Sequence, residues 1–134
     1  GWGKPLAGQP SVGVPLLAAA PAVPRERVID HPAALLDLTA TWLDYAGAKP
    51  LPGMQSRSLR NVFEGRASSV RDAVTSGLHA WRVAFDGRYK LIRGAEPEVQ
   101  LYDLRDDPVE SVNLAAKMPQ HVHRLSAYLA APAG

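Results

Sequence analysis

Between residues 81 and 113 the sequence alternates apolar and polar residues in short runs, and this pattern most constrains the fold. Residues 81–85 read WRVAF, Asp86-Gly87 follows, and residues 89–93 read YKLIR. Period-2 alternation is typical of a half-buried strand, and Asp-Gly is typical of a type I′ hairpin turn. A third run over residues 99–104 ends before Asp106-Asp107-Pro108, which breaks a strand. The stretch therefore predicts antiparallel strands joined by tight connections.

A sheet of this kind needs something to lie against, because two hairpin-linked strands alone are marginally stable in water. Residues 73–78 predict a further strand, which brings the sheet to about four strands. After Pro119, apolar residues recur at helical spacing on one face, at Val122, Leu125 and Leu129. We therefore expect a small four-stranded antiparallel sheet packed on a C-terminal helix.

The first half of the chain has a different pattern. The apolar run from Val14 to Ala20, closed by prolines, predicts a strand buried on both faces of a parallel or mixed sheet. A strand of this kind needs helices on both faces of its sheet, and this chain has too few helices to provide them. Asp30 and Pro32 predict the start of a helix whose apolar stripe runs over residues 35–46 and ends at Gly47. A short helix is expected over residues 58–64.

Composition excludes several classes of protein. The chain has no cysteine, which excludes disulfides, thiolate metal sites and a thiol nucleophile. The net charge of +2 is small and the basic residues are scattered, so we expect no nucleic-acid partner and no binding to an anionic membrane. The longest apolar run is too short to span a bilayer. The 134 residues are enough for one domain with a core.

Several motifs occur in register along nearly the whole chain. The C-terminal half contains GRYKLI at residues 87–92 and LYDL at 101–104, followed by Asp107-Pro108, Glu110 and Asn113-Leu114. The N-terminal half contains Gly3-Lys4, Val14-Pro15-Leu16, the stretch DLTATWLDYAG at 37–47 and QSRSL at 55–59. In this order and spacing the motifs resemble the C-terminal part of the sulfatase family.

The resemblance implies an α/β fold similar to that of alkaline phosphatase, with this chain as its C-terminal portion. Residues 1–66 would be the tail of the large α/β domain, contributing a strand and helices. Residues 67–134 would be the smaller C-terminal subdomain with its sheet and helix. The partners of the Val14–Ala20 strand would then lie in absent sequence, so we expect residues 1–66 either to be poorly ordered or to self-associate through exposed apolar surface.

Two residues are candidates for the site. A lysine in a Gly- and Pro-rich loop is by itself most often a solvated charge, but the resemblance implies that Lys4 contacts the sulfate group. His79 falls in a region that faces the substrate cleft in the family, and the resemblance implies contact with the organic part of the substrate. A surface histidine between strands is the simpler interpretation. Gly77 stands where a carboxylate is frequent in the family.

The resemblance also implies cofactors, formylglycine and Ca²⁺ or Mg²⁺, in a missing N-terminal part, and none in this chain. We expect no metal site here. Asp106, Asp107 and Glu110 favour a turn and a helix cap over a metal cluster. His121 and His123 are two residues apart on a predicted helix and so point to different faces.

The sequence therefore predicts the C-terminal part of a sulfuric ester hydrolase acting on a sulfated small molecule or glycan, and inactive alone. Two alternatives stay open. One is part of a phosphoester or phosphonate hydrolase of the same superfamily. The other is a non-catalytic module that binds a sulfated glycan or a partner protein.

Overall fold

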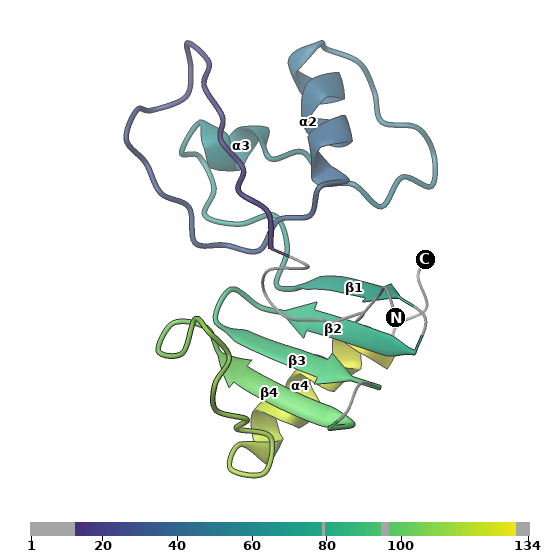
Figure 1. Cartoon of the computed structure of the whole chain (residues 1–134). Coiled ribbons are helices and arrows are strands. Elements are labelled where there is room, and N and C mark those ends of the chain that lie inside the picture. The colour runs from purple at the N-terminus through teal and green to yellow at the C-terminus, as the bar shows by residue number, and fades with distance from the viewer. Residues whose placement is uncertain (1–12, 79, 95–96, 131–134) are drawn as a thin grey trace, which may run out of the picture. The chain divides into compact units, whose positions relative to one another are not determined.

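The computed structural model describes residues 13–78, 80–94 and 97–130 (Figure 1). These residues form two compact units. One spans Leu16–Val74, and the other contains the described residues from Thr75 onward together with residues 13–15. Within the described part of the chain, no helix has both the length and the apolar character needed to cross a bilayer.

The second unit is built on a four-stranded sheet in the order β1-β2-β3-β4. Its strands are β1 (Val74–Leu78), β2 (Trp81–Phe85), β3 (Tyr89–Arg93) and β4 (Val99–Asp103). β2 pairs antiparallel with β3, and β3 pairs antiparallel with β4, so that Leu91 lies opposite both Ala84 and Leu101. The predicted sheet is confirmed, because alternation of apolar and polar residues reports a strand directly.

The turn between β2 and β3 differs from the predicted type I′ turn. That turn requires positive φ at both central residues, but Gly87 has φ +99° whereas Asp86 is not among the described residues with positive φ. The Asp86 carboxylate instead accepts hydrogen bonds from the N–H groups of Arg88, at 2.8 Å, and Tyr89, at 2.7 Å. The aspartate therefore acts through its side chain rather than through its backbone conformation.

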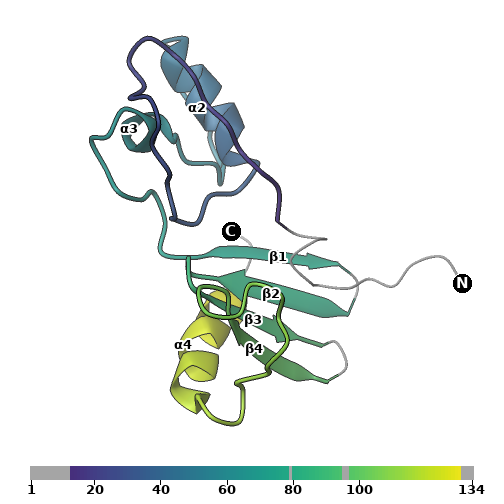
Figure 2. The same ribbon diagram turned by 60° about the vertical axis from the view of Figure 1, so that its left-hand side comes forward.

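Helix α4 (Pro119–Ala130) covers one face of this sheet, as Figures 1 and 2 show. Leu125 is fully buried against Ala84, Leu91 and Leu101, which come from three neighbouring strands. Burying a leucine side chain contributes about 1.5–3 kcal/mol. The predicted packing of the C-terminal helix on the sheet is confirmed.

The opposite face of the sheet contains a second apolar cluster and a buried lysine. Trp81, Val83 and Ile92 form the cluster. Lys90 is 1% exposed, and its Nζ lies 2.6 Å from Oε1 of Glu110, in the segment that follows β4. Burial lowers the pKa of Lys90, while the Glu110 carboxylate favours the charged ammonium. The ion pair therefore fastens the segment after β4 to the sheet.

The predicted strand over Val14–Ala20 is wrong. Residues 13–20 have no regular secondary structure, and Leu17 is 94% exposed. A buried strand needs neighbouring strands to pair its N–H and C=O groups and cover for its two faces. The described residues of the Leu16–Val74 unit provide no strand on which this run could pair, apart from the first residue of β1.

The helix predicted to begin near Asp30 and Pro32 begins later. Helix α2 spans Asp37–Tyr45, and Asp30 is exposed. The Asp37 carboxylate accepts the N–H of Ala34 at 2.9 Å, so the chain before the helix turns around Asp37. At the other end, Gly47 has φ +69° and closes the helix as predicted. Helix α3 (Arg60–Phe63) is shorter than the predicted helix over residues 58–64.

Candidate functional site

Both predicted site residues, Lys4 and His79, lie outside the described residues. Gly77 lies two residues before His79, in β1, and is among the described residues. A Cβ atom at Gly77 would lie 2.6 Å from Cδ of Arg82 and 2.9 Å from the carbonyl oxygen of Trp81. A side chain at this position therefore requires a shift of the backbone, and here glycine fits where the family often has a carboxylate.

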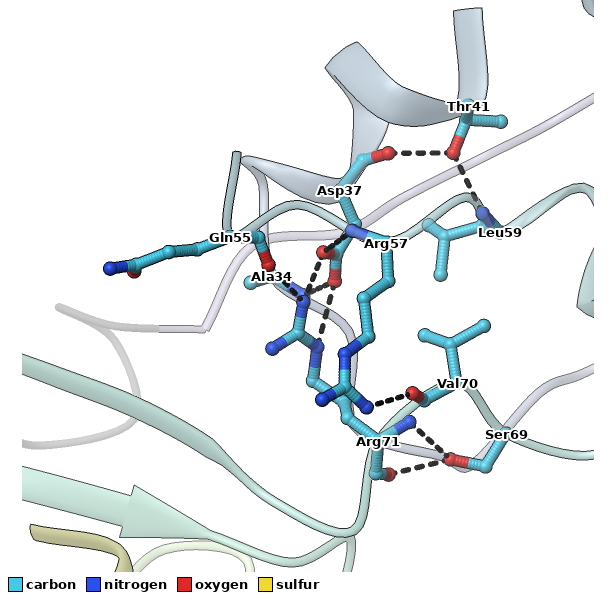
Figure 3. Close-up of polar contacts among 9 residues, drawn as sticks. All are labelled: Ala34, Asp37, Thr41, Gln55, Arg57, Leu59, Ser69, Val70 and Arg71. Carbon is cyan, nitrogen blue, oxygen red and sulfur yellow. Dashed lines mark hydrogen bonds and ion pairs between the residues drawn. The ribbon is translucent and has the colours of Figure 1, made fainter. Parts of the chain in front are cut away.

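The most extensive polar cluster in the Leu16–Val74 unit lies along one side of α2. Asp37, Thr41 and Asp44 are spaced by four and three residues, which places them on one face of a helix. Oδ1 of Asp37 accepts the N–H of Arg57 at 2.8 Å, and Oγ1 of Thr41 accepts the N–H of Leu59 at 2.8 Å (Figure 3). This face of α2 therefore binds the backbone of the 57–59 segment.

Asp44 extends the same face toward α3. Its carboxylate accepts the hydroxyl hydrogen of Ser58, at 2.6 Å, and a guanidinium hydrogen of Arg60, at 3.1 Å. These two hydrogen bonds, that of Ser58 first, lower the pKa of Asp44. The guanidinium of Arg60 also lies 4.8 Å from the centroid of the Tyr45 ring and 3.0 Å from Glu64. The contacts of Asp44 therefore position α3 against the end of α2.

Asp37 is the centre of the cluster. Its side chain is fully buried and accepts four hydrogen bonds, from the N–H groups of Ala34 and Arg57 and from Nε and Nη2 of Arg71 (Figure 3). Nη1 of Arg57 in turn donates to the carbonyl oxygen of Val70 at 2.7 Å. The two arginines therefore hold the 69–71 segment, just before β1, against the start of α2.

This arrangement is suited to structure rather than to chemistry. A carboxylate that acts as a nucleophile, a base or a metal ligand needs an accessible oxygen, whereas both oxygens of Asp37 are buried and occupied by hydrogen bonds. A buried, fully paired ion pair of this kind is costly to break. Two of the motifs that carry the sulfatase resemblance, residues 37–47 and 55–59, therefore bind each other through Asp37, Thr41 and Asp44.

The acidic stretch after β4 is held by ion pairs and hydrogen bonds. Its three carboxylates are bound to different partners: Asp106 to Arg88, Asp107 to the N–H groups of Ser111 and Val112, and Glu110 to Lys90. The backbone hydrogen bonds lower the pKa of Asp107. Within the described ranges, no group of three His, Cys, Asp or Glu side chains could hold a metal ion. The turn interpretation is confirmed for Asp107, whose carboxylate accepts the N–H groups of residues four and five positions later in the chain.

The two histidines of α4 have different surroundings, as predicted. The ring of His121 stacks on that of Tyr89 with centroids 4.1 Å apart, whereas His123 is exposed. They do not converge on a common ligand.

Sequence reasoning missed the two buried ion pairs, Asp37 with Arg71 and Lys90 with Glu110. The partners are 34 and 20 residues apart, so no local spacing connects them. The signal that could have found the first is the repetition of polar residues at i, i+4 and i+7 from Asp37, because it gives the helix a polar face opposite its apolar stripe.

Known proteins similar to this chain include several sulfatases. Arylsulfatase K of Mus musculus is 27% identical over an alignment of 131 residues, and the alignment covers 86% of this chain and 24% of that protein. The structure of BT1596, a 2-O GAG sulfatase, superposes with a TM-score of 0.69 at 26% identity and covers 83% of this chain and 27% of that one. BT4656, solved with its substrate D-glucosamine-2-N,6-O-disulfate, gives a TM-score of 0.58 at 25% identity over 69% of this chain and 22% of that one.

The chain thus spans about a quarter of the length of the relatives it matches. The model of one family, described as N-sulphoglucosamine sulphohydrolase, C-terminal, matches residues 2–130. That range includes both the α2 cluster and the four-stranded sheet with α4. Because the match covers nearly the whole chain, this protein belongs to the family of sulfatase C-terminal domains typified by N-sulphoglucosamine sulphohydrolase.

Proposed function

We propose that this chain is the C-terminal part of an enzyme that hydrolyses sulfate esters on a sulfated sugar. The observation that carries the proposal is the family match over residues 2–130. The hydrogen bonds between the 37–47 and 55–59 motifs support it, because they give those motifs a common role in one fold. The matched region makes up 24% and 27% of two relatives, so most of the proposed enzyme lies outside this chain.

In this proposal residues 1–66 belong to the large α/β domain and residues 67–134 form the smaller subdomain. The support for the first assignment is that residues 13–33 have no helix or strand, while several of their large apolar side chains are exposed. Such a segment needs other parts of a domain to cover it. The second assignment rests on the sheet, which has its own core with α4.

The nucleophile and the metal belong to the rest of the enzyme in this proposal. The family resemblance implies formylglycine and Ca²⁺ or Mg²⁺, a hard cation that takes carboxylate and amide oxygen ligands. When bound, the cation would neutralise charge on the sulfate group. The carboxylates of Asp106, Asp107 and Glu110 have other partners and are not assigned to it.

We assign Lys4 to the sulfate group and His79 to the organic part of the substrate. As a sulfate ester breaks, negative charge collects on the leaving oxygen. A positioned ammonium stabilises this charge more strongly in the transition state than in the ground state. A histidine against the sugar would instead affect substrate binding and selectivity. The support for both roles is the family resemblance of the surrounding sequence.

The proposed substrate class is inferred from the substrates of similar proteins. One similar structure is named as a 2-O GAG sulfatase and another was solved with a disulfated glucosamine. We therefore propose that the sugar is a sulfated unit of a glycosaminoglycan.

The test uses the enzyme made of this chain and the polypeptide that its gene encodes before it, assayed on an aryl sulfate and on sulfated glucosamines. Lys4→Ala is expected to lower kcat by on the order of 100- to 1000-fold, as for loss of one electrostatic contact to a transition state. Lys4→Arg should recover only part of this, because a planar guanidinium does not replace a compact ammonium. His79→Ala should change KM, and to different extents for different sugars.

Lys49→Ala is the matched control, since Lys49 is an exposed lysine of the same chain. The 134-residue chain alone is expected to show no turnover. Metal-dependent hydrolysis by that chain, or a kcat within about twofold of the parent for Lys4→Ala, would refute the corresponding part of the proposal.

A further inference from the structure

Helix α2 is arranged with its polar side toward the rest of its unit and its apolar side outward. The inward side consists of Asp37, Ala40 and Thr41, which are all buried. On the outward side, Leu35 just before the helix is 61% exposed and Trp42 is 67% exposed. A surface helix of a complete domain normally shows the opposite arrangement, with its apolar stripe against the core.

The polar groups of the inward side already have partners. Asp37 and Thr41 already bind the backbone of residues 57 and 59, and Asp37 also binds Arg71. The helix is therefore fixed by hydrogen bonds in an orientation that points Leu35 and Trp42 outward. We refer to Leu35, Leu36 and Trp42 as the outer face of α2.

Exposed apolar side chains are concentrated in the same part of the chain. Of the twelve large apolar side chains exposed among the described residues, nine lie between residues 14 and 51. The remaining three are Leu78, Val109 and Val112. Scattered exposed apolar residues are ordinary, but Leu35 and Trp42 are seven residues apart and so share one side of the helix, which makes the outer face of α2 an apolar surface.

What covers this surface is indicated by the relatives. They continue well beyond the region matched here, which is 24% of arylsulfatase K and 27% of BT1596. The family model describes the matched region as C-terminal, so the additional polypeptide precedes it. A polypeptide segment that is covalently joined to this region is always available to cover it. A second copy of this chain could cover the surface only if the surface were complementary to itself.

We propose that the outer face of α2 is the docking surface for an apolar face of the preceding, catalytic part of the sulfatase polypeptide. The proposal rests on the proposed function only in taking that part from a sulfatase. It goes further in naming Leu35, Leu36 and Trp42 as the contact residues. It also assigns the orientation of these side chains to the hydrogen bonds that Asp37 and Thr41 accept from the backbone of residues 57 and 59.

The absence of cysteine in this chain allows a direct test. Trp42→Cys and Leu35→Cys are made singly, both in the 134-residue chain and in the longer protein that includes the polypeptide encoded before it. The rate of reaction with a maleimide is read peptide by peptide by mass spectrometry, which separates these positions from any cysteine of the added part. We expect labelling of both positions to be at least tenfold slower in the longer protein.

Val109→Cys is the matched control, because Val109 is 80% exposed and lies in the segment after β4. Its labelling rate should be the same in both proteins. Equal rates at positions 35 and 42 in the two proteins would overturn the proposal. Slow labelling of the 134-residue chain by itself, if it becomes slower at higher protein concentration, would also overturn the proposal. A second copy of this chain would then be the molecule that covers the surface. A gene that encodes no preceding polypeptide would also overturn the proposal.

Labelling needs no turnover, so the two proposals can fail separately. Protection of positions 35 and 42 in a longer protein without sulfatase activity would support the docking surface and refute the proposed hydrolysis. Sulfatase activity in a longer protein whose positions 35 and 42 are labelled as fast as in the 134-residue chain would support the proposed hydrolysis and refute the docking surface.

Discussion

At the scale of single residues, Asp37 shows how a buried charge becomes a structural element. A carboxylate without access to water is tolerated only when hydrogen bonds and a counter-charge replace its hydration. Asp37 has both, from the amides of Ala34 and Arg57 and from the guanidinium of Arg71. Through these contacts one side chain joins the start of α2 to two segments that follow it in the chain.

We predict that Asp37→Asn destabilises the Leu16–Val74 unit by about 3–5 kcal/mol, the usual cost of breaking a buried ion pair. The substitution preserves shape but leaves the guanidinium of Arg71, whose side chain is only 16% exposed, without its counter-charge. Urea-dependent hydrogen exchange of peptides that cover α2 measures the effect. Asp30→Asn, at an exposed aspartate, is the control and should change little. A loss below about 0.5 kcal/mol for Asp37→Asn would show that the pair contributes nothing net.

At the scale of elements, the β2–β3 turn is joined to the end of β4 by an ion pair. Arg88 donates from Nε and Nη2 to the carboxylate of Asp103, at 2.9 Å and 2.6 Å from Oδ2. The hydrogen bonds from Arg88 lower the pKa of Asp103 below its usual range. The sheet is therefore fastened at this end by charge as well as by its backbone ladder.

The pH dependence of this contact has a definite sign. A carboxyl group whose pKa is lower in the folded than in the unfolded state stabilises the fold above its unfolded pKa, about 3.9 for aspartate. That contribution is lost as the pH falls through the folded-state pKa. We predict that the difference in Tm between the parent chain and Asp103→Asn is greatest near neutral pH and shrinks below about pH 4.

Thermal unfolding followed by circular dichroism from pH 7 to pH 2.5 provides the measurement. Asp72→Asn serves as the control because Asp72 is exposed, and its difference from the parent should stay small throughout. A Tm difference for Asp103→Asn that is constant with pH would show that the effect comes from packing rather than from charge.

At the scale of the whole molecule, the two units differ in how they are held together. The sheet unit has an apolar core between its strands and α4, centred on Leu91 and Leu125. The Leu16–Val74 unit depends more on polar contacts around Asp37 and leaves large side chains such as Leu17 and Trp42 exposed. Apolar burial is the main source of stability, so the sheet unit is expected to be the more stable of the two.

We predict that amide hydrogen exchange of the 134-residue chain will show this difference directly. Strands β2 to β4 and helix α4 should be the slowest to exchange, while residues 13–33, which have no helix or strand, should exchange within seconds. Mass spectrometry of peptic peptides gives the required resolution. Uniform protection from residue 13 onward in a dilute monomer would contradict the prediction.

The sequence by itself determined the sheet and the helix that covers it. The alternation in residues 81–85 and 89–93 and the apolar spacing around Leu125 report local backbone geometry, and local geometry follows from neighbouring residues. It also determined the end of α2, because Gly47 has a positive φ that favours glycine. The family resemblance was likewise contained in the order and spacing of the motifs.

Other features were decided only by the tertiary structure. Val14–Ala20 has the composition of a buried strand, but a strand forms only where another strand can pair with it. Asp30 and Asp37 both suit the start of a helix, and α2 begins at Asp37 because Arg57 and Arg71 meet it there. Which charges meet depends on how distant segments are brought together, and no local pattern of residues records that.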